Sequence, residues 1–199
     1  MVADRFDLGA YFHAEFDEHS AVTRQTRERV EEPFAAFVAA CEKSLKNGGK
    51  LLFFGNGGSA ADAQNFATEL SVRYKTDRPA IAALALTTDS SVLTAAGNDL
   101  GFEHVFARQI EALGRSDDVA IGISTSGKSP NVLTGLARAR EQGLVTAAFT
   151  GRDGGDLPPL TDHCLIVPAE STARIQEMHI LLGQMLCGAI EIKLGLVGR

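Results

Sequence analysis

The sequence lacks several features that would assign a protein to a special class. No apolar run approaches the roughly 18–20 residues needed to cross a bilayer, so we expect no membrane span. The first 18 residues carry acids and lack the basic-then-apolar layout of a signal peptide. There is also no internal repeat, coiled-coil heptad or low-complexity stretch.

Cysteine is scarce, and positive charge is in the minority. Cys41, Cys164 and Cys187 are odd in number and widely spaced, which predicts reduced core thiols rather than disulfides or zinc ligands. The chain has 19 Lys and Arg against 25 Asp and Glu, and the net charge of -6 argues against non-specific nucleic-acid binding. We therefore expect a cytoplasmic protein with no membrane partner and no direct nucleic-acid partner.

The remaining composition is that of an ordinary globular chain, with 45% hydrophobic and 22% charged residues. Its 199 residues predict a single domain, 1–199, with an N-terminal helical extension over about residues 1–47. Within that extension we expect two helices, near 6–29 and 32–46, because Gly48 and Gly49 end the helical pattern.

Apolar, strand-like runs then alternate with helix-like segments. Continuous apolar strands separated by helices predict an α/β fold, a five-stranded parallel sheet flanked by helices. The N- and C-terminal helices are expected to serve oligomer packing. The strands are expected near 51–54, 81–86, 119–123, 145–149 and 164–167, and the later helices near 60–74, 90–95, 105–113, 130–142 and 173–194.

Two loops of small residues each join an expected strand to an expected helix. They span residues 55–62 (GNGGSAAD) and 124–129 (STSGKS). Backbone N–H groups of such loops and the helix dipole point at one place, which is typical of an anion site. Candidate phosphate-binding residues are therefore the loop amides, those of Gly57 and Gly58 included, and the hydroxyls of Ser59, Ser124, Ser126 and Ser129.

Neither loop fits a nucleotide-binding signature. The Gly-x-x-x-x-Gly-Lys-Ser/Thr pattern is absent, and the first loop lacks the final Gly of the dinucleotide fingerprint in strict spacing. A sugar phosphate fits better than a dinucleotide. The alternative is that glycine and serine only make tight turns between strand and helix.

Five segments together resemble the sugar isomerase (SIS) superfamily, and most closely its phosphoheptose isomerases. The resemblance runs in order, with matching spacing, from about residue 34 to residue 194. The five segments are 55–62, 87–99, 124–129, 150–155 and 174–179. The resemblance implies a flavodoxin-like SIS fold and a homotetramer in which the first and last helices pack between subunits.

The resemblance also implies an activity and further site residues. The activity is conversion of sedoheptulose 7-phosphate to D-glycero-D-manno-heptose 7-phosphate by enediol-type proton transfer, for heptose and lipopolysaccharide precursors. Positions that match sugar contacts in the family are Asn56, Arg73, Asp99 and Thr125, and Glu69 matches the catalytic base.

Two positions depart from the family pattern. At the position of Asn65 the family usually has His. At the position of Gln184 it usually has a second His, which is the acid partner in catalysis. Some members bind zinc through those two His residues together with a Glu and a Gln, which match Glu69 and Gln176 of this chain. Amide side chains are poor zinc ligands and do not titrate, so we assign no certain cofactor and no confident metal ligand. Gln184 is still a catalytic candidate, because it can hydrogen-bond a substrate oxygen.

The departures leave a second hypothesis open. A non-catalytic relative in the superfamily, a DnaA initiator-associating protein, shares most of the motifs. The alternative to an isomerase is therefore a sugar-phosphate sensor or a protein that docks an initiator. His179 falls about 140° from Gln184 around the last helix, so it cannot occupy the Gln184 position. We expect His179 to be a packed or interface histidine.

Overall fold

The computed structural model describes residues 6–198 and places a parallel five-stranded sheet at the centre of the molecule. The strand order is β2-β1-β3-β4-β5. This arrangement confirms the predicted α/β fold. The strands are β1 (Leu51–Gly55), β2 (Ala83–Ala85), β3 (Val119–Ser124), β4 (Val145–Gly151) and β5 (His163–Val167).

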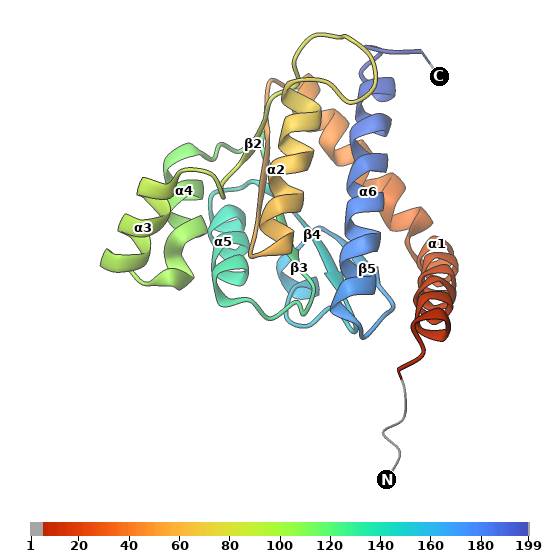
Figure 1. Ribbon diagram of the computed structural model, residues 1–199. Coiled ribbons are helices and arrows are strands. Elements are labelled where there is room, and N and C mark those ends of the chain that lie inside the picture. The colour runs from red at the N-terminus through yellow and green to blue at the C-terminus, as the bar shows by residue number, and fades with distance from the viewer. Residues whose placement is uncertain (1–5, 199) are drawn as a thin grey trace.

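Helices cover both faces of the sheet (Figure 1). One face packs against α1 (Leu8–Lys46), α2 (Gly58–Ser71) and α6 (Thr172–Lys193). The other packs against α3 (Ser90–Asp99), α4 (Val105–Leu113) and α5 (Pro130–Glu141). Short 3-10 turns span Phe102–His104 and Pro158–Leu160.

The expectation of two separate N-terminal helices is wrong, because α1 is one helix of 39 residues with Pro33 inside it. Proline removes one N–H donor, which commonly breaks or kinks a helix. Here Val30 and Phe37 are buried on either side of Pro33, in the same core cluster. Packing of both halves against one core offsets the lost hydrogen bond.

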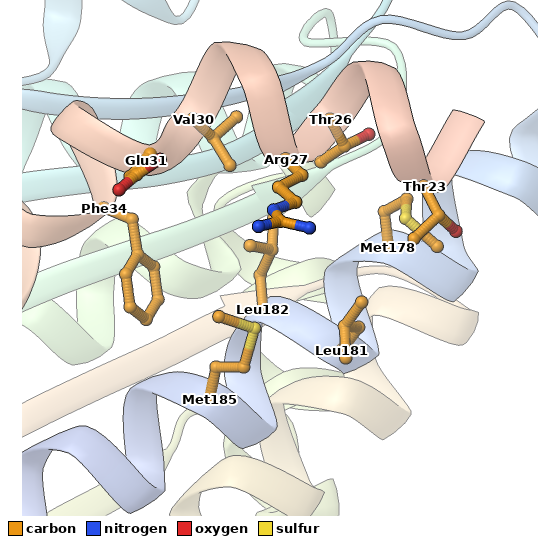
Figure 2. A pocket seen from close by; sticks show the side chains of 10 residues that line it. All are labelled: Thr23, Thr26, Arg27, Val30, Glu31, Phe34, Met178, Leu181, Leu182 and Met185. Atoms are coloured by element: carbon orange, nitrogen blue, oxygen red, sulfur yellow. The ribbon is translucent and has the colours of Figure 1, made fainter. Parts of the chain in front are cut away.

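A groove of about 390 Å³ runs between α1 and α6 (Figure 2). Its walls are mostly apolar, and Leu181 and Met185 on α6 are 42% and 47% exposed. The lining residues are Thr23, Thr26, Arg27, Val30, Glu31, Phe34, Met178, Leu181, Leu182 and Met185.

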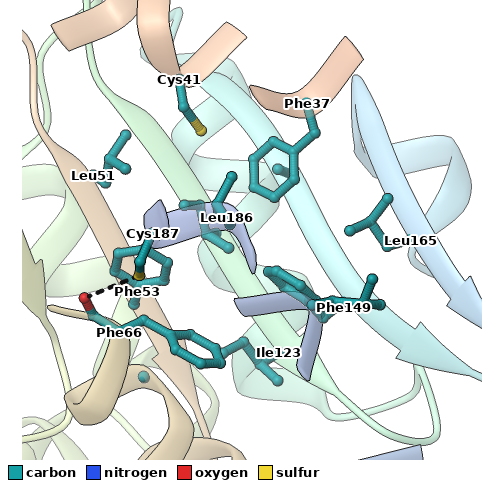
Figure 3. Packing of buried hydrophobic residues seen from close by; sticks show 14 of the residues in the cluster. Phe37, Cys41, Leu51, Phe53, Phe66, Ile123, Phe149, Leu165, Leu186 and Cys187 are labelled. Atoms are coloured by element: carbon teal, nitrogen blue, oxygen red, sulfur yellow. Dashed lines mark hydrogen bonds between the residues drawn. The ribbon is translucent and has the colours of Figure 1, made fainter. Parts of the chain in front are cut away.

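The core divides into two clusters because side chains alternate along each strand. In β1, Leu51 and Phe53 point to the α1–α2–α6 face, whereas Leu52 and Phe54 point to the other face. Figure 3 shows the first cluster, in which the Cys187 thiol donates a weak hydrogen bond to the Phe66 carbonyl at 3.8 Å.

The cysteines behave largely as predicted. Cys41 and Cys187 are buried in the first cluster, and burial raises the pKa of both thiols. Cys164 is half-buried and packs against the second cluster. None of the three forms a disulfide within residues 6–198, and no helix there is long and apolar enough to cross a membrane.

Candidate functional site

The chain reverses its direction of winding between β1 and β3, and the site loops lie at that point. From β1 the chain goes outward to β2, then returns to place β3 on the other side of β1. Gly55 at the end of β1 pairs with Ile123, and Ser124 at the end of β3 pairs with Thr150 of β4. Ligands of open α/β sheets bind at such a switch point, outside the carboxyl ends of the strands.

The first loop leaves backbone donors free at the start of α2. Gly57 occupies the N-cap position with φ of 56°, a conformation that glycine adopts without strain, and no side chain caps the helix. Within residues 6–198, the N–H groups of Gly57 and Gly58 have no backbone acceptor. Ser59, in the first turn, is buried at 4% exposure. The loop thus presents unpaired N–H groups at a helix N-terminus.

The second loop gathers hydroxyls and rests on the turn after β4. The Oγ atoms of Ser124 and Ser129 lie 3.0 Å apart, and Ser126 Oγ accepts from the Lys128 N–H at 3.2 Å. The Asp156 N–H donates to the Gly127 carbonyl at 3.0 Å. The turn after β4 therefore holds the second loop through a backbone hydrogen bond. Thr125, between the two serines, is half-buried.

A reciprocal amide pair joins the two loops. Asn56 Nδ2 donates to Asn131 Oδ1, and Asn131 Nδ2 donates to Asn56 Oδ1, both at 2.8 Å. Asn131 lies in the first turn of α5 and is 2% exposed. Asn56 therefore lies at the predicted site. One of its N–H groups and its carbonyl oxygen are already hydrogen-bonded to Asn131, and these bonds hold the two loops together.

A second polar cluster lies where α2 and α6 run side by side (Figure 1). Gln184 Nε2 of α6 donates to Asn65 Oδ1 at 2.6 Å and lies 3.4 Å from Glu69 Oε1. Asn65 Nδ2 also donates to Glu69 Oε1, at 3.4 Å. The structure therefore brings together the three residues that the sequence singled out for catalysis and for departure from the family pattern.

Gln176 links this helix pair to the first loop. A Cβ at Gly58 would lie 2.0 Å from Gln176 Nε2, so the amide lies directly against the start of α2. Gln176 and Gln184 are eight residues apart on α6, which is about 12 Å along a helix. The stretch of α6 from Gln176, beside the first loop, to Gln184, beside Glu69, is therefore about 12 Å long.

Comparisons with known proteins agree with this architecture. A SIS domain family model matches residues 16–151. The phosphoheptose isomerase of Paramagnetospirillum magneticum is 60% identical over 184 residues, covering 92% of this chain and 96% of that protein. Solved phosphoheptose isomerases from Neisseria gonorrhoeae and Francisella tularensis match with TM-scores of 0.88 and 0.91 and identities of 44% and 35%. Each of the two matches covers 94% of this chain and 100% of the solved one.

The chain belongs to the phosphoheptose isomerase family of SIS-domain proteins.

Two residues predicted from the phosphoheptose isomerase resemblance do not join the loops within this single chain. Arg73 follows α2, is largely exposed and pairs with Asp77 at 2.8 Å. Asp99 is the exposed last residue of α3 and accepts from Asn98 at 2.7 Å. Within residues 6–198, no hydrogen bond connects either side chain to the two loops.

The donor set around Glu69 does not fit the zinc site known in some phosphoheptose isomerases. Zinc in proteins is held by Cys, His and carboxylates. Residues 6–198 contain no group of three such side chains that could hold a metal ion. Glu69 is the one charged group among the four candidate ligands. Gln184 donates to Asn65 Oδ1, and both Gln184 and Asn65 donate to the Glu69 carboxylate.

His179 is a packed residue, as predicted. It is fully buried, and its Nε2 lies 3.1 Å from the Thr150 carbonyl oxygen. Burial lowers its pKa to about 4. The ring is therefore neutral at pH 7 and lies against the end of β4.

The sequence interpretation missed three residues. Asn131 has a weak signal, a polar residue just after Ser129-Pro130 at a helix start. Asp62 lies within the first motif, and burial raises its pKa to about 6, with Oδ2 buried and unpaired. The Arg78 side chain is fully buried and pairs with Glu191 at 2.6 Å, and no local sequence pattern marks that long-range contact.

Proposed function

We propose that this protein isomerises sedoheptulose 7-phosphate to D-glycero-D-manno-heptose 7-phosphate, with Glu69 as the base. Membership of the phosphoheptose isomerase family supports the reaction class. The product would feed heptose-containing glycans such as lipopolysaccharide. Three cysteines without disulfides are consistent with a reducing compartment, and we propose the cytoplasm.

The α2–α6 seam is the observation that carries the proposal. Free N–H groups lie at the end of the seam where Gln176 contacts Gly58, and the serine hydroxyls lie on the adjoining second loop. Glu69 lies beside Gln184, which is about 12 Å further along α6. An extended seven-carbon sugar with a terminal phosphate spans roughly such a length. The phosphate would bind the loops, through Ser59, Ser124, Ser126 and Ser129, while the carbonyl end of the sugar reaches Glu69.

Isomerisation moves a proton between neighbouring carbons through an enediol. Glu69 would remove a proton from C1 of the ketose, and the same carboxyl would return a proton to C2. Gln184 and Asn65 cannot exchange protons in this way, because carboxamides do not titrate at neutral pH. They would contribute hydrogen bonds, with proton movement between the two oxygens passing through water or the substrate itself.

We also propose a homotetramer in which α1 and α6 pack between subunits. The exposed Leu181 and Met185 line the groove between these helices. Tyr11, Phe12 and Phe16 on α1 are each at least 50% exposed. Apolar surface of this extent is typical of a protein–protein interface, and identical copies of the helices would supply matching apolar faces.

The test is an assay of the purified protein with sedoheptulose 7-phosphate, in which NMR follows the aldose phosphate. We expect turnover in the wild type and a loss of roughly 10²–10⁴-fold in Glu69→Gln, because the variant has no base. Glu111→Gln, which removes an exposed carboxylate paired with Arg108, should leave turnover unchanged.

One outcome favours the second hypothesis. Non-titrating amides at Asn65 and Gln184 are the feature expected of a sugar-phosphate sensor rather than an isomerase. Saturable binding of sedoheptulose 7-phosphate without turnover would contradict the isomerase proposal and support a sensor. Turnover that survives Glu69→Gln would show an isomerase that uses another base.

A further inference from the structure

We propose that Asn65 and Gln184 are positioning residues that form an amide clamp on Glu69 and hold its carboxylate without a metal ion. The proposal rests on the proposed role of Glu69 as the base. The amide clamp consists of the side chains of Asn65 and Gln184, which hydrogen-bond to each other and to one oxygen of Glu69.

The clamp acts on one side of the carboxylate. Both amide nitrogens lie 3.4 Å from Glu69 Oε1. No hydrogen bond within residues 6–198 reaches Oε2, and that atom is not among the buried polar atoms without a partner. Oε1 is thus the held oxygen, and Oε2 is the oxygen that is open to a substrate proton.

The two amides restrain each other more strongly than either restrains Glu69. The bond from Gln184 Nε2 to Asn65 Oδ1 is 2.6 Å, the shortest of the three. Because this bond occupies Asn65 Oδ1, the amide of Asn65 must turn its NH₂ group toward Glu69, four residues on along the same face of α2. Gln184 therefore fixes Asn65, and the pair then fixes the carboxylate.

The main chain at Glu69 is held from a different direction. Arg78 donates to the Glu69 carbonyl oxygen at 2.6 Å, and its guanidinium also pairs with Glu191 of α6. Side chains of Arg78 and Glu191 are 0% and 2% exposed, so water does not weaken this contact. The amide clamp therefore acts on a residue whose backbone is already anchored to α6.

The same hydrogen bonds oppose metal binding at this place. A cation would need lone pairs from Asn65 or Gln184, yet Asn65 Oδ1 already accepts from Gln184 and both NH₂ groups face Glu69. Binding would require both amides to rotate and would break all three hydrogen bonds. Glu69 would then be the only charged ligand, and one carboxylate is not enough for a tight zinc site.

Near-isosteric apolar variants test the clamp. Asn65→Leu and Gln184→Met keep the side-chain size and remove the hydrogen bonds. We expect each to lower kcat roughly 10- to 100-fold with KM within about twofold of the wild type, because a misplaced base slows chemistry more than binding. Since the two amides act as one unit, the double variant should be no more than about twofold slower than the slower single variant.

A matched control and a metal arm complete the experiment. Gln64→Leu removes an exposed amide next to Asn65 in α2 and should keep wild-type kcat. The wild type, dialysed against a chelator, should keep its kcat and show no saturable heat when titrated with Zn²⁺ alone. Asn65→His combined with Gln184→His should create zinc binding in the same titration.

Several outcomes would overturn the clamp. They are wild-type kcat in the single variants, multiplicative losses in the double variant, loss of activity on chelation, or wild-type zinc binding that Glu69→Gln removes. If the wild type has no turnover at all, the proposed function fails instead. The clamp is then judged by melting temperatures, where the double variant should lose clearly less than the sum of the single losses; additive losses would overturn it.

Discussion

At the level of single residues, hydrogen bonds between neutral amides hold the candidate site together. The pairs Asn56–Asn131 and Asn65–Gln184 each join segments that are far apart in the sequence. Amides donate and accept at every pH between the acid and alkaline extremes, so these contacts keep their geometry while carboxylates titrate. Asp62, near the first loop, is the residue whose ionisation should change the stability of the protein with pH.

Asn131→Ala should weaken both the fold and the binding of the sugar phosphate. The change leaves the Asn56 amide without its partner, which typically costs about 1–3 kcal/mol in the free energy of unfolding. We expect KM for sedoheptulose 7-phosphate to rise more than kcat falls, because the first loop is no longer tied to α5. Urea unfolding and steady-state kinetics measure the two effects. Asn47→Ala, an exposed amide at the end of α1, is the control and should change neither.

Asp62→Asn should stabilise the protein at neutral pH but not in acid. Burial raises the pKa of Asp62 to about 6, so the folded state binds a proton more tightly than the unfolded state. The stability that this protonation provides is present below the unfolded pKa and is lost as pH rises to about 6. Above that pH the wild type folds with an unfavourable buried charge, which Asn removes.

Thermal melts between pH 4 and pH 8 measure this effect. Because the side chain is only half-buried, we expect a gain of roughly 2–4 °C at pH 7.5, the shift that about 1 kcal/mol produces in a chain of this length. The gain should shrink as pH falls from 6 toward 4. A gain that stays constant across this range would contradict the assignment.

At the scale of elements, the second loop depends on the turn after β4. Gly127 has φ of 66°, and a Cβ there would lie 2.1 Å from the Gly154 carbonyl oxygen. Backbone thus packs against backbone, with no side chain that could move aside. The second loop and the turn therefore pack as one unit, although about 25 residues of chain separate them.

Gly127→Ala should therefore disrupt the proposed phosphate site. Alanine at positive φ costs roughly 1–2 kcal/mol, and the clash with Gly154 adds to it by displacing the loop. We expect KM for the sugar phosphate to rise at least 10-fold, measured by steady-state kinetics. Gly143→Ala is matched, because Gly143 has φ of 78° but its Cβ would meet nothing closer than 4.0 Å. That control should lose some stability and keep its KM; equal KM values in the two variants would contradict the prediction.

At the scale of the whole molecule, one chain leaves much apolar surface uncovered on α1 and α6. Leu181 and Met185 border the groove between the two helices, and Phe12 and Phe16 lie exposed toward the N-terminal end of α1. Surface of this kind lowers solubility unless another surface covers it. The proposed tetramer would cover it with copies of the same helices.

A charge at this surface should reduce the size of the assembly. Leu181→Glu combined with Met185→Glu would place carboxylates in the proposed interface, where burying them without partners is costly. Light scattering after gel filtration should report a tetramer for the wild type and dimers or monomers for the variant. Leu113→Glu, an exposed leucine at the end of α4, is the control and should remain tetrameric. A tetramer in both variants would contradict the proposed interface.

Local sequence patterns were enough to predict the strands, most helices and the two loops at the carboxyl edge of the sheet. Apolar runs such as 51–54 and 119–123 can only be buried on both faces, which requires a parallel sheet with helices on each side. The small residues at 55–59 and 124–129 follow those strands directly, so their position at the carboxyl edge follows from the fold class. These predictions use only residues that are close together in the sequence, so a single sequence is enough to make them.

Which polar groups meet depends on the three-dimensional fold. The contacts Asn56–Asn131, Gln184–Asn65 and Arg78–Glu191 join residues 75, 119 and 113 positions apart, and no periodicity in the sequence encodes such pairs. The continuity of α1 through Pro33 was decided in the same way, by burial of Val30 and Phe37 in one core. Hydrogen bonds and packing act over a few ångströms in space, so distant residues interact only once the fold has brought them together.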